Sequence, residues 1–404
     1  MTIPASHGRN SAMAESKKTA SNQIYGLDLL RFVAALFVVM FHLTYGFWAD
    51  GRQSGEMSER TFHVYAPLGE HFAIGWIGVQ IFFVISGFVI AYTANGRSPM
   101  YFIRRRFLRL LPGIWACSLL SVPFLLALGM PVKEIAFRMV NSVLILPFVA
   151  HVANSYWTLP IEMCFYTAIF AIILTNNFKH LENFAALLIG WSGFFWIGHF
   201  TVPQHNMLLS ALFGMNKLTQ LVLLQYAAFF ALGILIWLNF KFGLTARRAA
   251  LVAVAVVIDV VAILGETQKS SQWFADQQSF GVAVSIWAVS LLFFVFSIYR
   301  NDLFDRMSPR LKIAIRWIGL STYPLYLIHQ PFSEPVLGAL LKQGFNPWAV
   351  LAFGLGANIA LALGIAIYLE PLLRDRFEVI ADRLFTYLPV EKWGLNRYRD
   401  PLDI

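Results

Sequence analysis

Ten apolar stretches, separated by short polar segments, recur along the 404-residue chain. An α-helix needs about 20 apolar residues to cross a bilayer. The pattern therefore predicts an all-α, polytopic membrane helix bundle with about ten transmembrane helices. The predicted spans are residues 27–48, 72–94, 107–130, 157–175, 184–200, 220–239, 247–265, 280–300, 313–333 and 347–370.

Composition supports this class. The chain is 58% hydrophobic and only 13% charged, whereas soluble domains carry about 25% charged residues. The net charge of +9 does not indicate nucleic-acid binding, because membrane proteins gather Lys and Arg beside their spans on the cytoplasmic side. A further apolar segment, 135–150, is interrupted by Arg138, Asn141 and Pro147. It predicts an interfacial or re-entrant element rather than a span.

The distribution of Lys and Arg predicts the orientation. With the N-terminus inside, most of the 31 cations fall on the inner side. We therefore expect both termini to be cytoplasmic, with a disordered tail at 1–24, a membrane domain at 25–372 and a C-terminal tail at 373–404. No second soluble domain is expected. The cations on the predicted outer side are Arg52, Arg60, Lys133, Arg138, Lys217, Lys269 and Lys342.

Beyond Asp28 at its start, the first span contains two ionisable side chains. Arg31 and His42 are eleven residues apart, so they share a helix face and are separated by about 16 Å along the axis. Glu162 follows Trp157 by five residues in the fourth span, at a predicted depth similar to that of His42. Ionisable groups in a bilayer are costly and usually functional. We expect the Glu162 carboxylate to orient the His42 ring. The alternatives are that His42 only bonds a backbone carbonyl and that Glu162 is a protonated carboxyl.

The ninth span contributes candidates at the same outer level. It contains STYPLYLIHQPF, with Tyr326 and His329 on one face. Either residue could belong to the site or anchor the helix at the interface. In the second span, Gly75, Gly78 and Ser86 indicate close helix packing, or a narrow path beside the first span.

Arginines gather before the third span, in RSPMYFIRRRFLRLLP. Arg109 follows Arg106 by three residues and Arg105 by four, so they share a helix face. Arginine forks bind phosphate in a bidentate manner. The alternative is a positive-inside cluster that meets anionic lipid. An anion site inside and a base-like pair near the outside, about 15–20 Å apart, would suit acyl-coenzyme A, which has an anionic head and a long thioester arm.

These motifs resemble those of the acyltransferase 3 family over roughly residues 25–372. The resemblance rests on LDLLRFVAALFVVMFH, GWIGVQIFFVISGFVI, RRRFLRLLP, YWTLPIEMCFY and STYPLYLIHQP. The family transfers an acyl group from cytoplasmic acyl-CoA to a hydroxyl, often on a glycan. This chain looks like the stand-alone type, which lacks an added hydrolase-like domain.

The resemblance implies the roles of particular residues. His42 would be catalytic with Glu162 as its partner, and acyl-CoA would be the co-substrate, without a metal. The expected donor-binding residues are Arg31, Arg105, Arg106 and Arg109. The expected substrate-binding residues are Trp157, Tyr166, Tyr326 and His329. The acyl group is expected to be acetyl, and the protein is expected in a bacterial inner (cytoplasmic) membrane, in contact with lipid.

Several alternatives stay open from the sequence. The acceptor could be an exopolysaccharide or other surface polysaccharide, a lipopolysaccharide or a lipid-linked oligosaccharide. Transfer could be direct, with His42 as general base, or could pass through an acyl-His42 intermediate. A transporter of a lipid-linked sugar or of a proton-coupled solute is the rival class, because intramembrane His and Glu also mark proton relays. The outer stretch 49–71 reads as a solvated loop rather than a sugar contact, and His151, His199 and His205 are expected at the surface.

Overall fold

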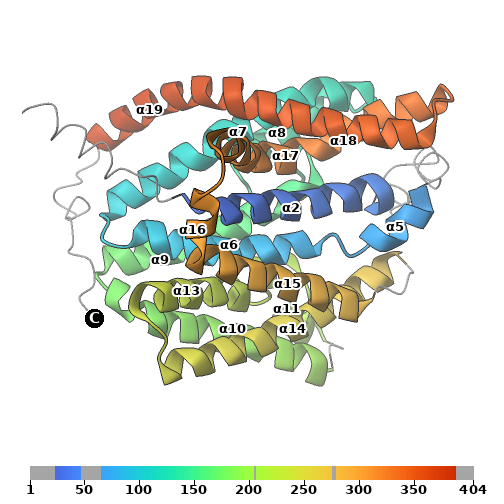
Figure 1. Ribbon diagram of the computed structural model, residues 1–404. Coiled ribbons are helices and arrows are strands. Elements are labelled where there is room, and N and C mark those ends of the chain that lie inside the picture. The colour runs from blue at the N-terminus through green and yellow to red at the C-terminus, as the bar shows by residue number, and fades with distance from the viewer. Residues whose placement is uncertain (1–22, 47–64, 204–205, 275–278, 388–404) are drawn as a thin grey trace, which may run out of the picture.

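The computed structural model describes residues 23–46, 65–203, 206–274 and 279–387. These residues form helices joined by short connections, without strands, and the long helices lie side by side with their axes roughly aligned (Figure 1). The predicted N-terminal tail and most of the loop 49–71 lie outside the described residues. The elements are α2 Tyr25–Phe41, η1 His42–Gly46, α5 Ala66–Phe72, α6 Ile77–Ala94, α7 Pro99–Ala127, α8 Val132–Val143, η3 Asn154–Trp157, α9 Thr158–Leu174, η4 Phe178–His180, α10 Leu181–Thr201, α11 Met207–Phe213, α12 Lys217–Leu221, α13 Ala227–Phe242, α14 Ala246–Phe274, α15 Phe280–Tyr299, α16 Asn301–Asp305, α17 Pro309–Lys342, α18 Pro347–Gly364, η5 Ile365–Leu369 and α19 Glu370–Tyr387.

A helix occupies each of the ten predicted spans, so the all-α, polytopic prediction is confirmed. Within the described residues, eight helical segments are long and apolar enough to cross a membrane. The other two predicted spans correspond to α13, which has 16 residues, and α17. The latter has 34 residues, but Arg310, Lys312 and Arg316 make its first turns polar. The protein is therefore a multi-pass membrane protein.

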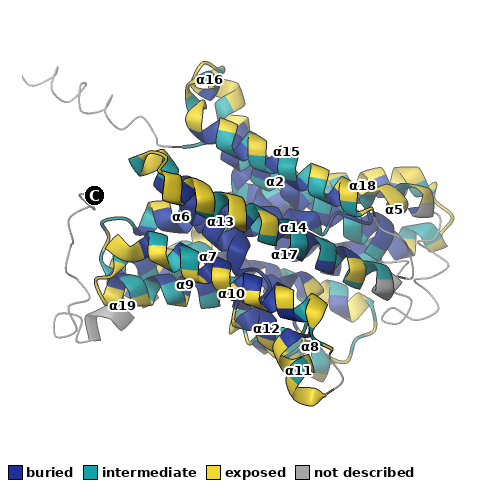
Figure 2. Cartoon of the chain, turned by 90° about the horizontal axis from the view of Figure 1, so that it is seen from below, coloured by how far each residue is buried: buried dark blue, intermediate teal, exposed yellow. Residues whose placement is uncertain are grey.

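The bundle buries a mixed core and exposes apolar side chains. Figure 2 shows buried residues in the middle of the bundle and exposed ones along its periphery. The exposed residues of the outer helices include Leu187, Ile197, Val257 and Leu292. Apolar side chains on the outside suit contact with lipid tails, which are themselves apolar.

Two glycines fix the register of α2 against α6. A Cβ on Gly78 would overlap the carbonyl oxygen of Ala34, and a Cβ on Gly75 would overlap that of Phe37. The backbones therefore touch at these two levels, as small residues allow in membrane helices. Since position 75 lies beside 37 and 78 beside 34, the helices are antiparallel. Residues near the middle of α6 must then face the first turns of α2.

The first part of the predicted C-terminal tail is helical. Residues 373–387 belong to α19, whose Phe377 ring packs edge-on against Phe107 and Trp115 of α7 at 5.8 and 5.3 Å between ring centroids. Arg104 also pairs with Asp382 at 2.8 Å. The segment α19 is joined to α18 by the π-helix η5, and a second π-helix, η1, starts at His42. Such π-turns often occur at functional sites.

The contact between α6 and α13 yields a prediction on stability. A Cβ on Gly233 would overlap the carbonyl oxygen of Val84, and a backbone cannot move aside as a flexible side chain can. Gly233→Ala should lower the free energy of unfolding by about 1–3 kcal/mol, measured as a lower Tm in detergent. The control is Gly190→Ala, because nothing lies within 4 Å of that Cβ position. Equal stability of the two variants would contradict the close packing of α6 and α13.

Candidate active site

Three arginines line one cavity in the bundle. Arg31 from α2 and Arg106 and Arg109 from α7 lie on the wall of a cavity of about 120 Å³, which α6, α9 and α17 close. Arg106 and Arg109 are three residues apart, so one face of α7 turns both inward. The remaining lining side chains that can form hydrogen bonds are Ser86, Thr158, Glu162, Tyr166, Thr322, Tyr323 and Tyr326.

Glu162 is the carboxylate of this cavity. Its Oε1 accepts a hydrogen bond from Ser86 Oγ at 2.6 Å, and its Oε2 accepts one from the Tyr166 hydroxyl at 3.2 Å. Both Arg31 and Arg106 interact electrostatically with it. Glu162 is thus the counter-charge within the cavity lining, and Asp28 of α2 is a second one, because it interacts electrostatically with Arg31 and Arg109.

Arg106 shows an unused capacity to bind an anion. Its Nη2 donates to Thr93 Oγ1 at 2.9 Å, whereas its buried Nε has no hydrogen-bond partner among the described residues. A buried donor without an acceptor is costly, and a phosphate oxygen would satisfy it. The donor set of the cavity therefore fits a phosphorylated ligand.

Two histidines meet at a different level of the bundle. His42 Nδ1 lies 2.8 Å from the carbonyl oxygen of Val38 and 3.2 Å from His329 Nε2. The ring centroids of the two histidines are 4.9 Å apart. His329 is fully buried, while His42 is half-buried. The two histidines are predicted to lie at the same depth, and in the structure they are in direct contact.

The structure does not bring Glu162 to His42. Glu162 is bonded to Ser86, and the register of α6 against α2 places Ser86 beside the first turn of α2, on the N-terminal side of Arg31. His42 lies eleven residues beyond Arg31 in the opposite direction, so its level is more than about 16 Å away along the axis. The depth estimate assumed that Trp157 marks the membrane surface. In the structure η3 precedes α9 and its Ser155 and Tyr156 are buried, so α9 begins inside the bundle.

Tyr326 lies between the cavity and the histidines. It lines the arginine cavity, and its hydroxyl is hydrogen-bonded to Thr158 Oγ1 at 3.1 Å. Its ring packs edge-on against Phe82 at 6.0 Å and lies 6.3 Å from the His329 ring. A ligand arm that runs from the arginines to His42 would pass Tyr326.

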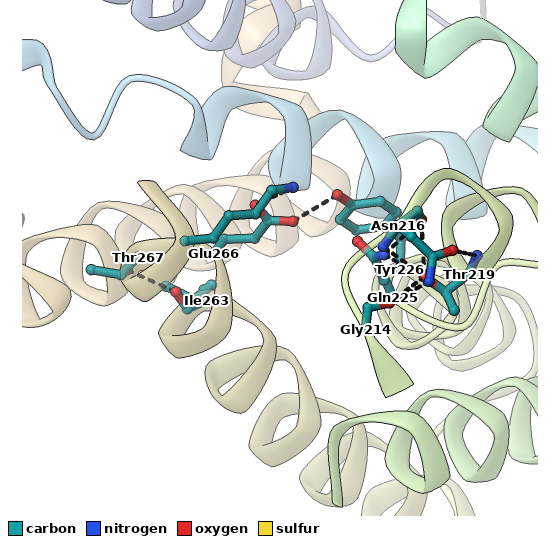
Figure 3. A network of polar contacts seen from close by, with 9 residues as sticks. Gly214, Asn216, Thr219, Gln225, Tyr226, Ile263, Glu266 and Thr267 are labelled. Atoms are coloured by element: carbon teal, nitrogen blue, oxygen red, sulfur yellow. Dashed lines mark hydrogen bonds and ion pairs between the residues drawn. The ribbon is translucent and has the colours of Figure 1, made fainter. Parts of the chain in front are cut away.

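Two other predicted residues lie outside the cavity lining. Arg105 is exposed and stacks over the Tyr101 ring, 5.5 Å from its centroid. Trp157 packs against the Tyr226 ring at 5.9 Å, and Lys217 donates to its carbonyl oxygen at 3.3 Å. Figure 3 shows why Tyr226 is rigid: its hydroxyl donates to Glu266 at 2.7 Å, beside a cluster of buried amide and hydroxyl groups.

Sequence reasoning missed Glu370 and misplaced His151. Glu370 is buried, interacts electrostatically with Arg109 and Arg374, and has an Oε1 without a partner among the described residues. The sequence signal that points to Glu370 is the position of a carboxylate at the end of an apolar span. His151 was expected at the surface, but it is buried, and burial together with nearby Lys217 lowers its pKa to about 4.

The candidate site thus consists of a cavity lined by arginines and a pair of histidines in contact, set apart along the bundle. The family model described as an acyltransferase domain, the acyltransferase 3 model, matches residues 24–367. The chain therefore belongs to this family of acyltransferases.

Two curated proteins are similar to part of the chain. The exopolysaccharide production protein ExoZ of Rhizobium meliloti (strain 1021) is 34% identical over 130 residues, covering 29% of this chain and 41% of that protein. Protein 2 in the picA locus of Rhizobium radiobacter is 30% identical over 141 residues, covering 30% of this chain and 63% of that protein. The matches thus span less than two thirds of either relative. No solved structure matches the chain.

The position of Glu162 predicts how its charge is used. Glu162→Gln keeps groups able to bond Ser86 and Tyr166 but removes the only carboxylate among the lining residues of the arginine cavity. The variant should unfold at a lower temperature, with a loss of about 2 kcal/mol, and coenzyme A should raise its Tm more than that of the wild type. The measurement is thermal unfolding in detergent with and without coenzyme A.

The matched control for this prediction is Glu134→Gln, which breaks the part-exposed pair between Glu134 and Arg138 at 2.7 Å. Exposed pairs contribute less than about 1 kcal/mol. If both variants lost the same stability, or if coenzyme A stabilised them equally, Glu162 would not act as the counter-charge of the cavity.

Proposed function

We propose that this protein is an integral-membrane O-acyltransferase. It moves an acyl group, expected to be acetyl, from acyl-CoA on the cytoplasmic side to a hydroxyl of an extracytoplasmic or lipid-linked carbohydrate. The observation that carries the proposal is the separation of the arginine cavity from the His42–His329 contact, with Tyr326 between them. Membership of the acyltransferase family supports the reaction class.

The arginine cavity holds the phosphates of the donor. Arg31, Arg106 and Arg109 supply guanidinium forks, and the unpaired Nε of Arg106 supplies a donor for a phosphate oxygen. The neutral pantetheine arm then extends past Tyr326 toward His42. The level difference of about 16 Å along α2 matches an extended arm and exceeds the reach of a small anion, so the geometry favours a long carrier over a free acyl phosphate.

His42 provides the reactive nitrogen. In direct transfer, His42 takes the proton of the sugar hydroxyl while that oxygen forms a bond to the acyl carbon. The carbon–sulfur bond breaks, and the proton ends on the departing sulfur of coenzyme A. In the two-step alternative, the imidazole nitrogen first accepts the acyl group from the thioester and then passes it to the hydroxyl.

The acceptor class rests on similarity. The relative from Rhizobium meliloti is described as an exopolysaccharide production protein, which supports a surface polysaccharide or its lipid-linked precursor as the acceptor. We place the protein in a bacterial inner membrane, with the arginine cavity at the cytoplasmic side. The distribution of Lys and Arg supports this orientation.

The first test separates an enzyme from a transporter. Purified protein in detergent should transfer or hydrolyse the label of acetyl-CoA, since an enzyme needs no closed membrane. His42→Ala should lower the rate at least about 1,000-fold and still bind coenzyme A, because His42 lies outside the arginine cavity. Near-wild-type rates in this variant would falsify the assignment of His42.

The second test examines the donor site. Arg106→Lys and Arg109→Lys should each raise the KM for acyl-CoA about tenfold with little change in kcat, because a lysine keeps the charge but loses the fork. The matched control is Arg105→Lys on the same helix, whose side chain is exposed and whose KM should stay unchanged. If the three substitutions had equal effects, the arginines would act only through their positive charge and would not form a specific binding site for acyl-CoA.

A further inference from the structure

The hydrogen bonds of His329 fix where its proton lies. His329 Nδ1 is 3.1 Å from the carbonyl oxygen of Leu325 and 3.0 Å from that of Tyr326. A carbonyl oxygen can only accept, so Nδ1 must carry the hydrogen. A neutral imidazole has a single N–H. The other nitrogen, Nε2, is therefore left with a lone pair.

The same argument applies to His42. Its Nδ1 is 2.8 Å from the carbonyl oxygen of Val38, so this nitrogen also carries the hydrogen. The lone pair of His329 Nε2 faces the same Nδ1–H at 3.2 Å. The two rings are thus complementary, and His42 donates to both acceptors. The second nitrogen of His42, Nε2, keeps its lone pair and has no hydrogen-bond partner among the described residues.

We propose that His329 is the positioning residue of the acyl transfer: its Nε2 accepts from His42 Nδ1–H and thereby holds the His42 ring with a bare Nε2 toward the reactants. The inference rests on the proposed function and replaces the predicted partnership of His42 with Glu162. An acceptor that fixes the tautomer of a catalytic imidazole is a general requirement of such sites. Here a neutral imidazole fills that role.

The reaction steps balance with this arrangement. His42 Nε2 takes the proton from the sugar hydroxyl, the hydroxyl oxygen bonds to the acyl carbon, and the carbon–sulfur bond breaks. While His42 is positive, its Nδ1–H remains bonded to the lone pair of His329. The proton on Nε2 then moves to the sulfur of coenzyme A, which restores the starting tautomer. The bare Nε2 is equally the nitrogen that would carry the acyl group in a two-step reaction.

The test compares three substitutions of His329. Glutamine can place an amide oxygen near the position of Nε2, where it accepts from His42. Asparagine is shorter, so its amide reaches only the position of Nδ1. Leucine cannot accept a hydrogen bond at all. We expect His329→Leu and His329→Asn to lower kcat about 100-fold and His329→Gln to lower it less than about 10-fold. The KM for acyl-CoA should change little, because His329 does not line the arginine cavity.

The controls separate positioning from folding. His199→Leu removes another histidine that bonds a backbone carbonyl, that of Phe213 at 2.7 Å, and should leave kcat unchanged. Coenzyme A binding by each His329 variant reports whether the donor cavity is still formed. If the glutamine and leucine variants have equal kcat, or if the leucine variant has wild-type kcat, the role of His329 is overturned. An inactive wild-type protein would instead count against the proposed function.

A spectroscopic readout tests the tautomer itself. In protein labelled with ¹⁵N at histidine, the His42 signals are found by comparison with His42→Gln. They should show a protonated Nδ1 and a bare Nε2 in the wild type and in His329→Gln, and a mixture of tautomers in His329→Leu. A His42 that carries its hydrogen on Nε2 in the wild type would overturn the proposal without any measurement of activity.

Discussion

The charge balance of the arginine cavity is the constraint on which the rest of the structure depends. Three guanidinium groups lie inside a bundle whose surroundings are apolar, and an isolated charge there is costly. Glu162 offsets part of this cost through its electrostatic interactions with Arg31 and Arg106, and Ser86 and Tyr166 hold its two oxygens. Four helices, α2, α6, α7 and α9, must meet at this point to supply these groups, so the cavity also determines how these helices are arranged.

The arginines of the cavity have counter-charges on several sides. Glu162 lines the cavity with them, while Asp28 and Glu370 interact electrostatically with Arg31 or Arg109. The unpaired Nε of Arg106 nevertheless leaves a specific place for an anion. Glu370 also interacts electrostatically with Arg109, and Gly113, one turn further along α7, leaves room for its carboxylate, since a Cβ there would contact Glu370 and Tyr323. The arginines are therefore held in place before any ligand arrives, which reduces the entropic cost of binding.

The sequence predicts the elements and the grouping of the arginines better than the neighbour of His42. Helical periodicity places Arg106 and Arg109 on one face, and both line the cavity. Span depth alone puts His42 and His329 at one level, and they touch. The same depth argument does not place Glu162 correctly, because it takes the start of each helix to lie at the membrane surface. The helix α9 instead begins after the buried residues of η3, inside the bundle. This shift of α9 along the bundle depends on how the connection before it packs, and the periodicity of the sequence carries no information about that packing.

Under the proposed function, the division between the arginine cavity and the histidine pair follows from what must cross the membrane. The phosphates of the donor carry several negative charges, and moving them through the bilayer would be prohibitive, whereas a thioester on a neutral arm can enter an apolar passage at much lower cost. An arginine cavity at one level retains the charges, and the imidazole pair receives only the neutral end. Had Glu162 stood beside His42, a negative charge would lie where the thiolate leaves, and it would oppose that step. A neutral acceptor on Nδ1–H orients the base without this repulsion, and the carboxylate stays with the arginines, where its charge stabilises the fold.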